Sequence, residues 1–123
     1  MLKTIKILTV VSLLGSGVLY ANSVRDVLSQ QVKFSHNVLK AYKKHKSKHL
    51  LTQIHSMKKA NLQLKNSVRD PEIKNLLVFL DICYDELRVT VRKPYSRDNA
   101  QLISDLSISI NEGTHYVKRA LKI

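Results

Sequence analysis

The 123-residue chain is poor in the residues that build most small functional sites: it has one cysteine, three glycines, two prolines and no tryptophan. A single cysteine excludes an intramolecular disulfide and any zinc site built from several thiolates. Three glycines leave no room for the glycine-rich loops that hold nucleotide phosphates. No pair of carboxylates is placed for acid–base catalysis. The sequence therefore predicts a protein that is not an enzyme and that needs no cofactor.

The chain begins with the layout of a secretory signal peptide. Lys3 and Lys6 precede an uncharged, mostly apolar run over 7–20, and the small residue Ala21 suits a cleavage site. We therefore expect a signal peptide over 1–21, one mature domain over 22–123 and a periplasmic location. A retained membrane anchor is the alternative, because the uncharged run approaches the length of a spanning helix.

Acidic residues are scarce, since nine Asp and Glu oppose 21 Lys and Arg and leave a net charge of +12. A hydrophobic content of 44% nevertheless excludes a disordered basic tail. The excess lies in 22–65, where ten basic residues meet only Asp26, whereas 66–123 carries nine basic and eight acidic residues. The positive field of the protein therefore comes from the first half of the mature domain.

This asymmetry predicts a basic surface that attracts anionic partners. Outside the cytoplasm these are an anionic membrane surface, an envelope polymer or an acidic protein, and nucleic acid is not expected. A solvated surface without a dedicated partner is the alternative. The predicted surface consists of Lys43, Lys44, Lys46, Lys48, Lys58 and Lys59.

Apolar residues recur at three- and four-residue steps and predict four helices, over about 23–46, 48–68, 71–92 and 97–121. Asp70 is suited to cap the third helix, with Pro71 at its first position, and Ser96 to cap the fourth. Alternation over 106–110 is typical of a strand, but the helical stepping continues through it. Short connections make successive helices antiparallel, so we expect an all-α, up-down-up-down four-helix bundle. The stripe expected to be buried on the fourth helix is Ile103, Leu106, Ile110, Gly113, Val117 and Ala120.

Two patterns have both a functional and a structural interpretation. Gln31, Ser35 and Asn61 fall on stripes that face the core, so they form either a mutual hydrogen-bond network or a small polar ligand site. The third helix carries a second apolar strip opposite its core stripe, which is typical of an interface. The strip predicts a homodimer or another protein partner, unless this helix is buried more centrally. Its residues are Val78, Ile82 and Val89.

Histidine and cysteine offer weaker candidates. His45 and His49 are four residues apart, a spacing that chelates a metal if both lie on one helix. No carboxylate or cysteine accompanies them and the neighbouring lysines repel a cation, so we expect no metal site. Cys83 borders the expected core, where a lone cysteine acts as a small hydrophobic residue.

The first mature helix, SVRDVLSQQVKFSHNVLKAY, resembles the opening helix of the NarX-like N-terminal domain, which also occurs in the PilJ-type chemotaxis transducers of type IV pili. That family opens with a pattern close to R-M-L-S-Q-R. The matching stretch here is 26–32, in which L-S-Q at 28–30 is identical. The segment 70–107 is similar in outline to the second half of the family.

The resemblance implies a four-helix sensor domain outside the inner membrane, often dimeric, which in some members binds a small anion such as nitrate through arginines of the first helix. Here Asp26 and Gln31 stand at the positions of those arginines. Our leading hypothesis is a stand-alone sensor or ligand-binding domain of this type, and the alternative is a basic structural or interaction protein. The residues expected to bind a ligand are Arg25, Ser29, Gln31, Ser35 and Asn61.

Overall fold

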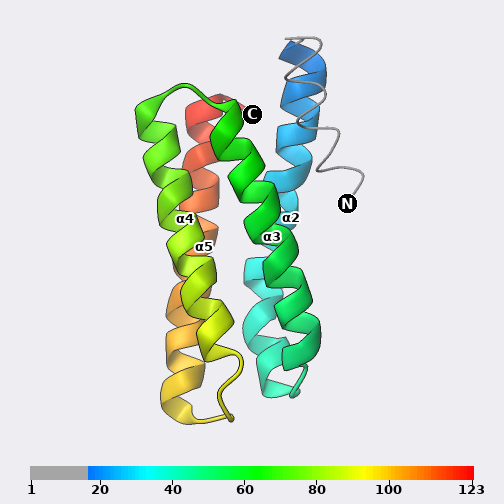
Figure 1. Cartoon of the computed structure of the whole chain (residues 1–123), viewed down its shortest axis with the longest axis vertical. Coiled ribbons are helices and arrows are strands. Elements are labelled where there is room, and N and C mark those ends of the chain that lie inside the picture. Colours follow the sequence, from blue (N-terminus) through cyan, green and yellow to red (C-terminus); the bar gives the residue numbers. More distant parts are fainter. Residues whose placement is uncertain (1–16) are drawn as a thin grey trace.

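The computed structural model describes residues 17–123, which fold into helices α2 (Gly17–Lys43), α3 (Ser47–Ser67), α4 (Pro71–Thr90) and α5 (Arg97–Leu121) (Figure 1). The expected all-α class is confirmed, and the segment 106–110 lies within α5. Most of the predicted signal peptide, 1–16, lies outside the described residues, and 17–21 belong to α2. Within 17–123 no helix combines the length and the apolar character that crossing a membrane requires.

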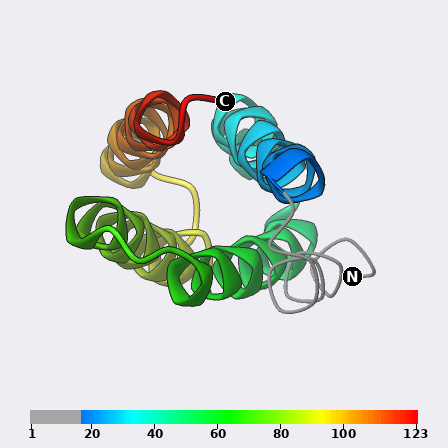
Figure 2. The same cartoon turned by 90° about the horizontal axis from the view of Figure 1, so that it is seen from above.

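The four helices form a closed ring around one core. Each helix packs against the next one along the chain, and α2 completes the ring by packing against α5 (Figure 2). The turn 44–46 and the connection 91–96 lie at one end of the bundle, and the connection 68–70 lies at the other end, near the C-terminus (Figure 1). This is the up-down-up-down order that short connections predict.

Local signals in the sequence fix where α4 and α5 begin. The Asp70 side chain accepts a hydrogen bond of 2.8 Å from the backbone N–H of Glu72, and the Ser96 hydroxyl accepts one of 3.0 Å from the N–H of Asn99. Each side chain thus satisfies one of the backbone donors that a helix start leaves unpaired. Both predicted caps are confirmed.

The end of α2 differs from the prediction, because the helix stops at Lys43 and not near Lys46. His45 has a φ of 60° and places the chain in the left-handed region. The N–H of His45 then donates to the carbonyl of Tyr42, and that of Lys46 to the carbonyl of Ala41, both at 3.0 Å. This pair of bonds is a Schellman motif with histidine where glycine is usual, and it separates α2 from α3.

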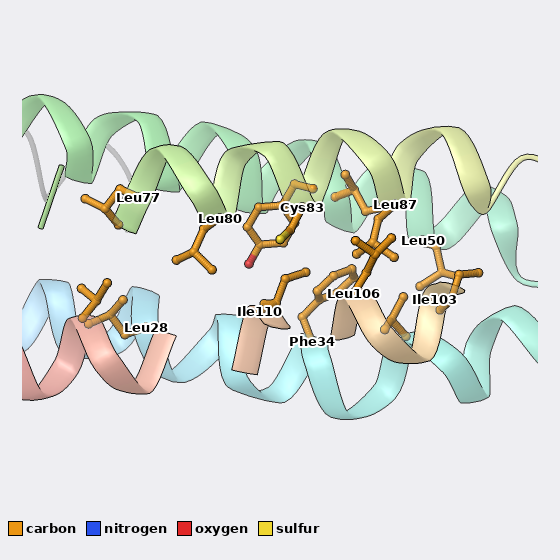
Figure 3. Close-up of a cluster of buried hydrophobic side chains, with 14 of the residues drawn as sticks. Leu28, Phe34, Leu50, Leu77, Leu80, Cys83, Leu87, Ile103, Leu106 and Ile110 are labelled. Carbon is orange, nitrogen blue, oxygen red and sulfur yellow. The ribbon is translucent and has the colours of Figure 1, made fainter. Parts of the chain in front are cut away.

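The apolar stripes of the helices meet in one core (Figure 3). Leu28, Leu80 and Ile110, which come from three helices, are each fully buried. The rings of Phe34 and Tyr84 pack with their centroids 6.0 Å apart. These contacts remove a continuous set of large side chains from water, which is the main term that stabilises the bundle.

One predicted core position is wrong. Ala120 is exposed, and Leu121 packs against the core in its place. The buried stripe continues from Val117 by a step of four residues, which keeps the side chain closer to the core face than a step of three does.

Gly113 lies where α4 and α5 approach each other closely. A Cβ atom on this residue would lie only 2.9 Å from Cδ2 of Leu80 and 3.7 Å from the ring of Phe79. Glycine costs about 1 kcal/mol relative to alanine inside a helix. At this position the missing side chain lets α4 and α5 pack directly against each other.

Candidate functional site

The polar residues of the core form a hydrogen-bonded layer that crosses the whole bundle. The Gln31 amide on α2 donates to Oδ1 of Asn61 on α3 at 3.4 Å and accepts from the Thr114 hydroxyl on α5 at 3.3 Å. The Asn61 amide donates to the carbonyl of Leu77 on α4 at 2.8 Å. Gln31 and Asn61 are therefore partners of each other, as the network interpretation predicts, and Thr114 is a member that the sequence did not reveal.

The structure does not gather the other predicted ligand residues around this layer. The Ser35 hydroxyl donates to the carbonyl of Val32 in its own helix at 2.7 Å. Arg25 is exposed and Ser29 is half-buried. None of the five predicted ligand residues lines the groove described below.

The turn after α2 is tied to the connection between α4 and α5. The hydroxyl of Tyr42 donates to the carbonyls of Lys93 and Pro94, at 3.2 and 2.9 Å. The Tyr42 ring also packs against that of Tyr95, with 5.8 Å between the centroids. Two segments about fifty residues apart in sequence therefore form a single surface at one end of the bundle.

This surface, which we name the basic end, collects cations from both segments. Its side chains are exposed, and they belong to Lys43, Lys44, Lys46, Lys48, Arg92, Lys93 and Arg97. The segments 43–49 and 91–97 contain no acidic residue, and Asp98 follows in the first turn of α5. Because like charges are held close together, the basic end attracts anions. The sequence pointed to the four lysines but not to the three residues that the fold adds to them.

A groove runs from the basic end along the contact between α2 and α3, and we name it the basic groove. Two hollows of about 270 and 320 Å³ share Asn37 and Gln53 and so adjoin each other. Their lining, all of it within the part of the chain that is described, includes no Asp or Glu. It consists of Gln30, Lys33, Phe34, Asn37, Lys40, Ala41, Lys44, Lys46, His49, Gln53 and Met57.

Two lysines that the sequence assigned to the basic surface lie apart from the basic end. Lys58 pairs with Asp85 and lies 3.7 Å from Asp81, so two carboxylates of α4 offset its charge. Lys59 is exposed one position further along α3. The inclusion of Lys58 in an anion-attracting surface is therefore wrong, since Lys58 serves to join α3 to α4.

The apolar strip predicted on α4 is solvent-exposed. Val78, Ile82 and Val89 are 41%, 52% and 53% exposed, and Phe79 beside them is 45% exposed. More central burial of this face is therefore wrong. The homodimer or protein partner that the strip predicts stays a prediction.

The remaining candidates are not placed for chemistry. His45 lies in the turn and His49 in α3, so they do not share the helix that chelation requires. Within 17–123 no group of three or more His, Cys, Asp or Glu is placed to hold a metal ion. Burial, with a smaller contribution from the charge of Glu86, raises the pKa of the Cys83 thiol from 9.0 to about 11. Burial thus favours the protonated thiol over the thiolate, which is the nucleophilic form.

Comparison with known proteins identifies no family for this chain. No family model, no curated protein and no solved structure matches the chain.

Proposed function

We propose that this chain is a non-enzymatic, exported helical-bundle protein that binds an anionic partner through the basic end and the adjoining basic groove. The observation that carries the proposal is the meeting of two cationic segments, 43–49 and 91–97, at one end of the fold. Such a concentration of like charge opposes folding through self-repulsion, and the binding of anions relieves it. The Tyr42 hydrogen bonds hold the two segments together.

The packing of the core supports this proposal over a ligand enclosed between the helices. Gln31 and Asn61 already satisfy each other, so a polar ligand would have to break the layer before it could bind. The cost of leaving a buried polar group unpaired is about 1–3 kcal/mol. The NarX-like sensor, which the sequence alone favours, is our second hypothesis, and it is supported by the resemblance over 26–32 and by the four-helix architecture that the resemblance implies.

The test is the binding of fluorescein-labelled dextran sulfate, measured by fluorescence anisotropy at increasing salt. We expect association that weakens steeply between low and physiological ionic strength, because exposed charges are screened. The variant Lys43→Gln/Lys93→Gln, which removes one lysine from each segment of the basic end, should bind several-fold more weakly.

The matched control is Lys59→Gln/Lys74→Gln, which removes the same charge from exposed positions on α3 and α4. It should retain most of the affinity. Equal losses in the two variants would mean that only net charge matters, and salt-insensitive or absent binding would overturn the proposal altogether.

A further inference from the structure

The basic groove differs from the basic end in shape, and this difference narrows the class of partner. We infer that the basic groove binds a short acidic peptide segment in an extended conformation. The inference rests on the proposed function and names the partner of the same site.

The form of the groove favours a chain over a membrane surface. Its base includes the buried ring of Phe34 and the half-buried side chain of Met57, which lie between the two helices. A flat bilayer surface cannot reach such a base. Within 23–123, the large hydrophobic side chains that are exposed include none from residues 23–43 of α2 and none that line the groove. The exposed Tyr95 lies at the basic end, whereas the lining of the groove itself lacks exposed apolar groups that would insert into a bilayer.

The centre of the groove carries groups that match a peptide backbone. Asn37 and Gln53 line both hollows, and Gln30 lines one of them. A side-chain amide both donates and accepts hydrogen bonds, as a peptide group does, although the Asn37 amide already donates once to the carbonyl of Lys33. The apolar base offers contact to the side chains of a peptide between its charged residues. This mixture of amides and apolar atoms suits a polypeptide, in which polar backbone and side chains alternate.

The rim of the groove supplies the charge. Lys33 and Lys40 follow one another along α2, Lys44 and Lys46 lie in the turn, and His49 lies in the first turn of α3. From Lys33 to the end of α2 at Lys43 the helix rises roughly 15 Å, which an extended peptide spans with about five residues. No arginine lines the groove, so the bidentate geometry that favours phosphate is missing. Carboxylates of Asp or Glu on the peptide then pair with the lysine ammonium groups.

The experiment measures the affinity of a fluorescein-labelled peptide that alternates glutamate and leucine, against the full chain. We expect two groove variants to weaken binding about tenfold. Lys40→Gln/Lys44→Gln removes two rim charges. Each exposed ion pair between a lysine and the peptide contributes a few-fold to the affinity. Asn37→Phe places an uncharged, bulky group where the two hollows join and keeps the net charge. The control is Lys59→Gln/Lys74→Gln, which removes two exposed lysines of α3 and α4 that belong to neither the basic end nor the groove, and it should weaken binding less than threefold.

Two further measurements separate this inference from the proposed function. Circular dichroism and thermal unfolding check that Asn37→Phe is folded, which we expect because Asn37 is exposed. Sedimentation with phosphatidylglycerol vesicles tests the membrane as an alternative partner. Binding to dextran sulfate or vesicles without binding to the peptide would overturn the inference and leave the proposed function standing. Peptide binding that is as strong in Asn37→Phe as in the parent would also overturn it. The absence of binding to all three probes would remove both.

Discussion

The contact between α2 and α3 and the contact between α4 and α5 are built in opposite ways. At the α4–α5 contact Gly113 lets Leu80 approach within van der Waals distance, and apolar side chains fill the space. At the α2–α3 contact the helices leave the basic groove open to solvent, and α2 packs more extensively against α5 than against α3. One contact holds the fold together, and the other keeps polar groups accessible.

This difference also separates stability from binding. Close-packed apolar contacts contribute most of the free energy of folding, whereas exposed lysines contribute little to it and repel one another. A chain with a net charge of +12 therefore needs a region of close apolar packing. The free energy of that packing outweighs the repulsion between the lysines that lie elsewhere on the surface.

The largest expected effect is on the α4–α5 contact. Leu80→Ala removes a fully buried side chain that packs against Gly113, and it should lower the free energy of unfolding by about 2–5 kcal/mol. Urea unfolding followed by circular dichroism measures the change. The comparison variant Leu62→Ala alters a side chain that is 49% exposed on α3 and should cost less than about 0.5 kcal/mol. Similar costs for the two variants would show that the core is not where the structure puts it.

The polar layer should show an intermediate effect. Asn61→Ala leaves the carbonyl of Leu77 and the amide of Gln31 without this partner, and it should cost about 1–3 kcal/mol of stability. Asn66→Ala, on the exposed side of the last turn of α3, is the control and should change stability by about 0.5 kcal/mol or less. If both substitutions are equally mild, the layer is not a stabilising network.

The smallest expected effect is a dependence of stability on pH. Because burial raises the pKa of Cys83 to about 11, the folded state holds this proton more tightly than the unfolded state, whose thiol has a pKa near 9.0. The stabilisation is therefore complete below pH 9 and is lost as the pH rises toward 11, by about 1–2 kcal/mol. Burial also raises the pKa of the neighbouring Tyr84 hydroxyl, which adds a loss of the same sign at higher pH.

The Cys83→Ala variant isolates the contribution of the thiol. Its free energy of unfolding, measured by urea at pH 8 and at pH 11, should fall less between the two pH values than that of the parent chain. Subtracting the change in one protein from the change in the other removes the contribution of the lysines, because both proteins contain the same lysines. An identical fall in both would show that the Cys83 thiol is accessible to water.

The fold was largely predictable because its signals are local. The side chains of Asp70 and Ser96 cap helices through bonds to residues two and three positions ahead, so a short stretch of sequence contains the whole interaction. The apolar stripes that include Leu80 and Ile110 repeat with the helical period, which needs no knowledge of the partner helix. The errors arose where a local rule was ambiguous. His45 takes a backbone conformation that usually indicates glycine, and Ala120 lies one position from the residue that is buried.

Only part of the candidate site could be predicted from the sequence. The lysines of 43–48 stand together in the sequence, and their charge alone identifies a basic surface. The pairing of Lys58 with Asp85 joins two helices and has no signal in either segment by itself. The same holds for the groove, because Lys33 and Lys40 belong to α2 whereas Gln53 belongs to α3. Neither helix shows which of its polar residues the other will approach.

The sequence by itself determined the helices, their antiparallel order and the sign of the charge, because each depends on residue type and on spacing within one segment. Tertiary structure alone decided that Arg92, Lys93 and Arg97 join the lysines of the first turn, and that Thr114 completes a layer with Gln31 and Asn61. These are contacts between residues about thirty to eighty positions apart. They exist only after the burial of the apolar stripes has brought the helices into register.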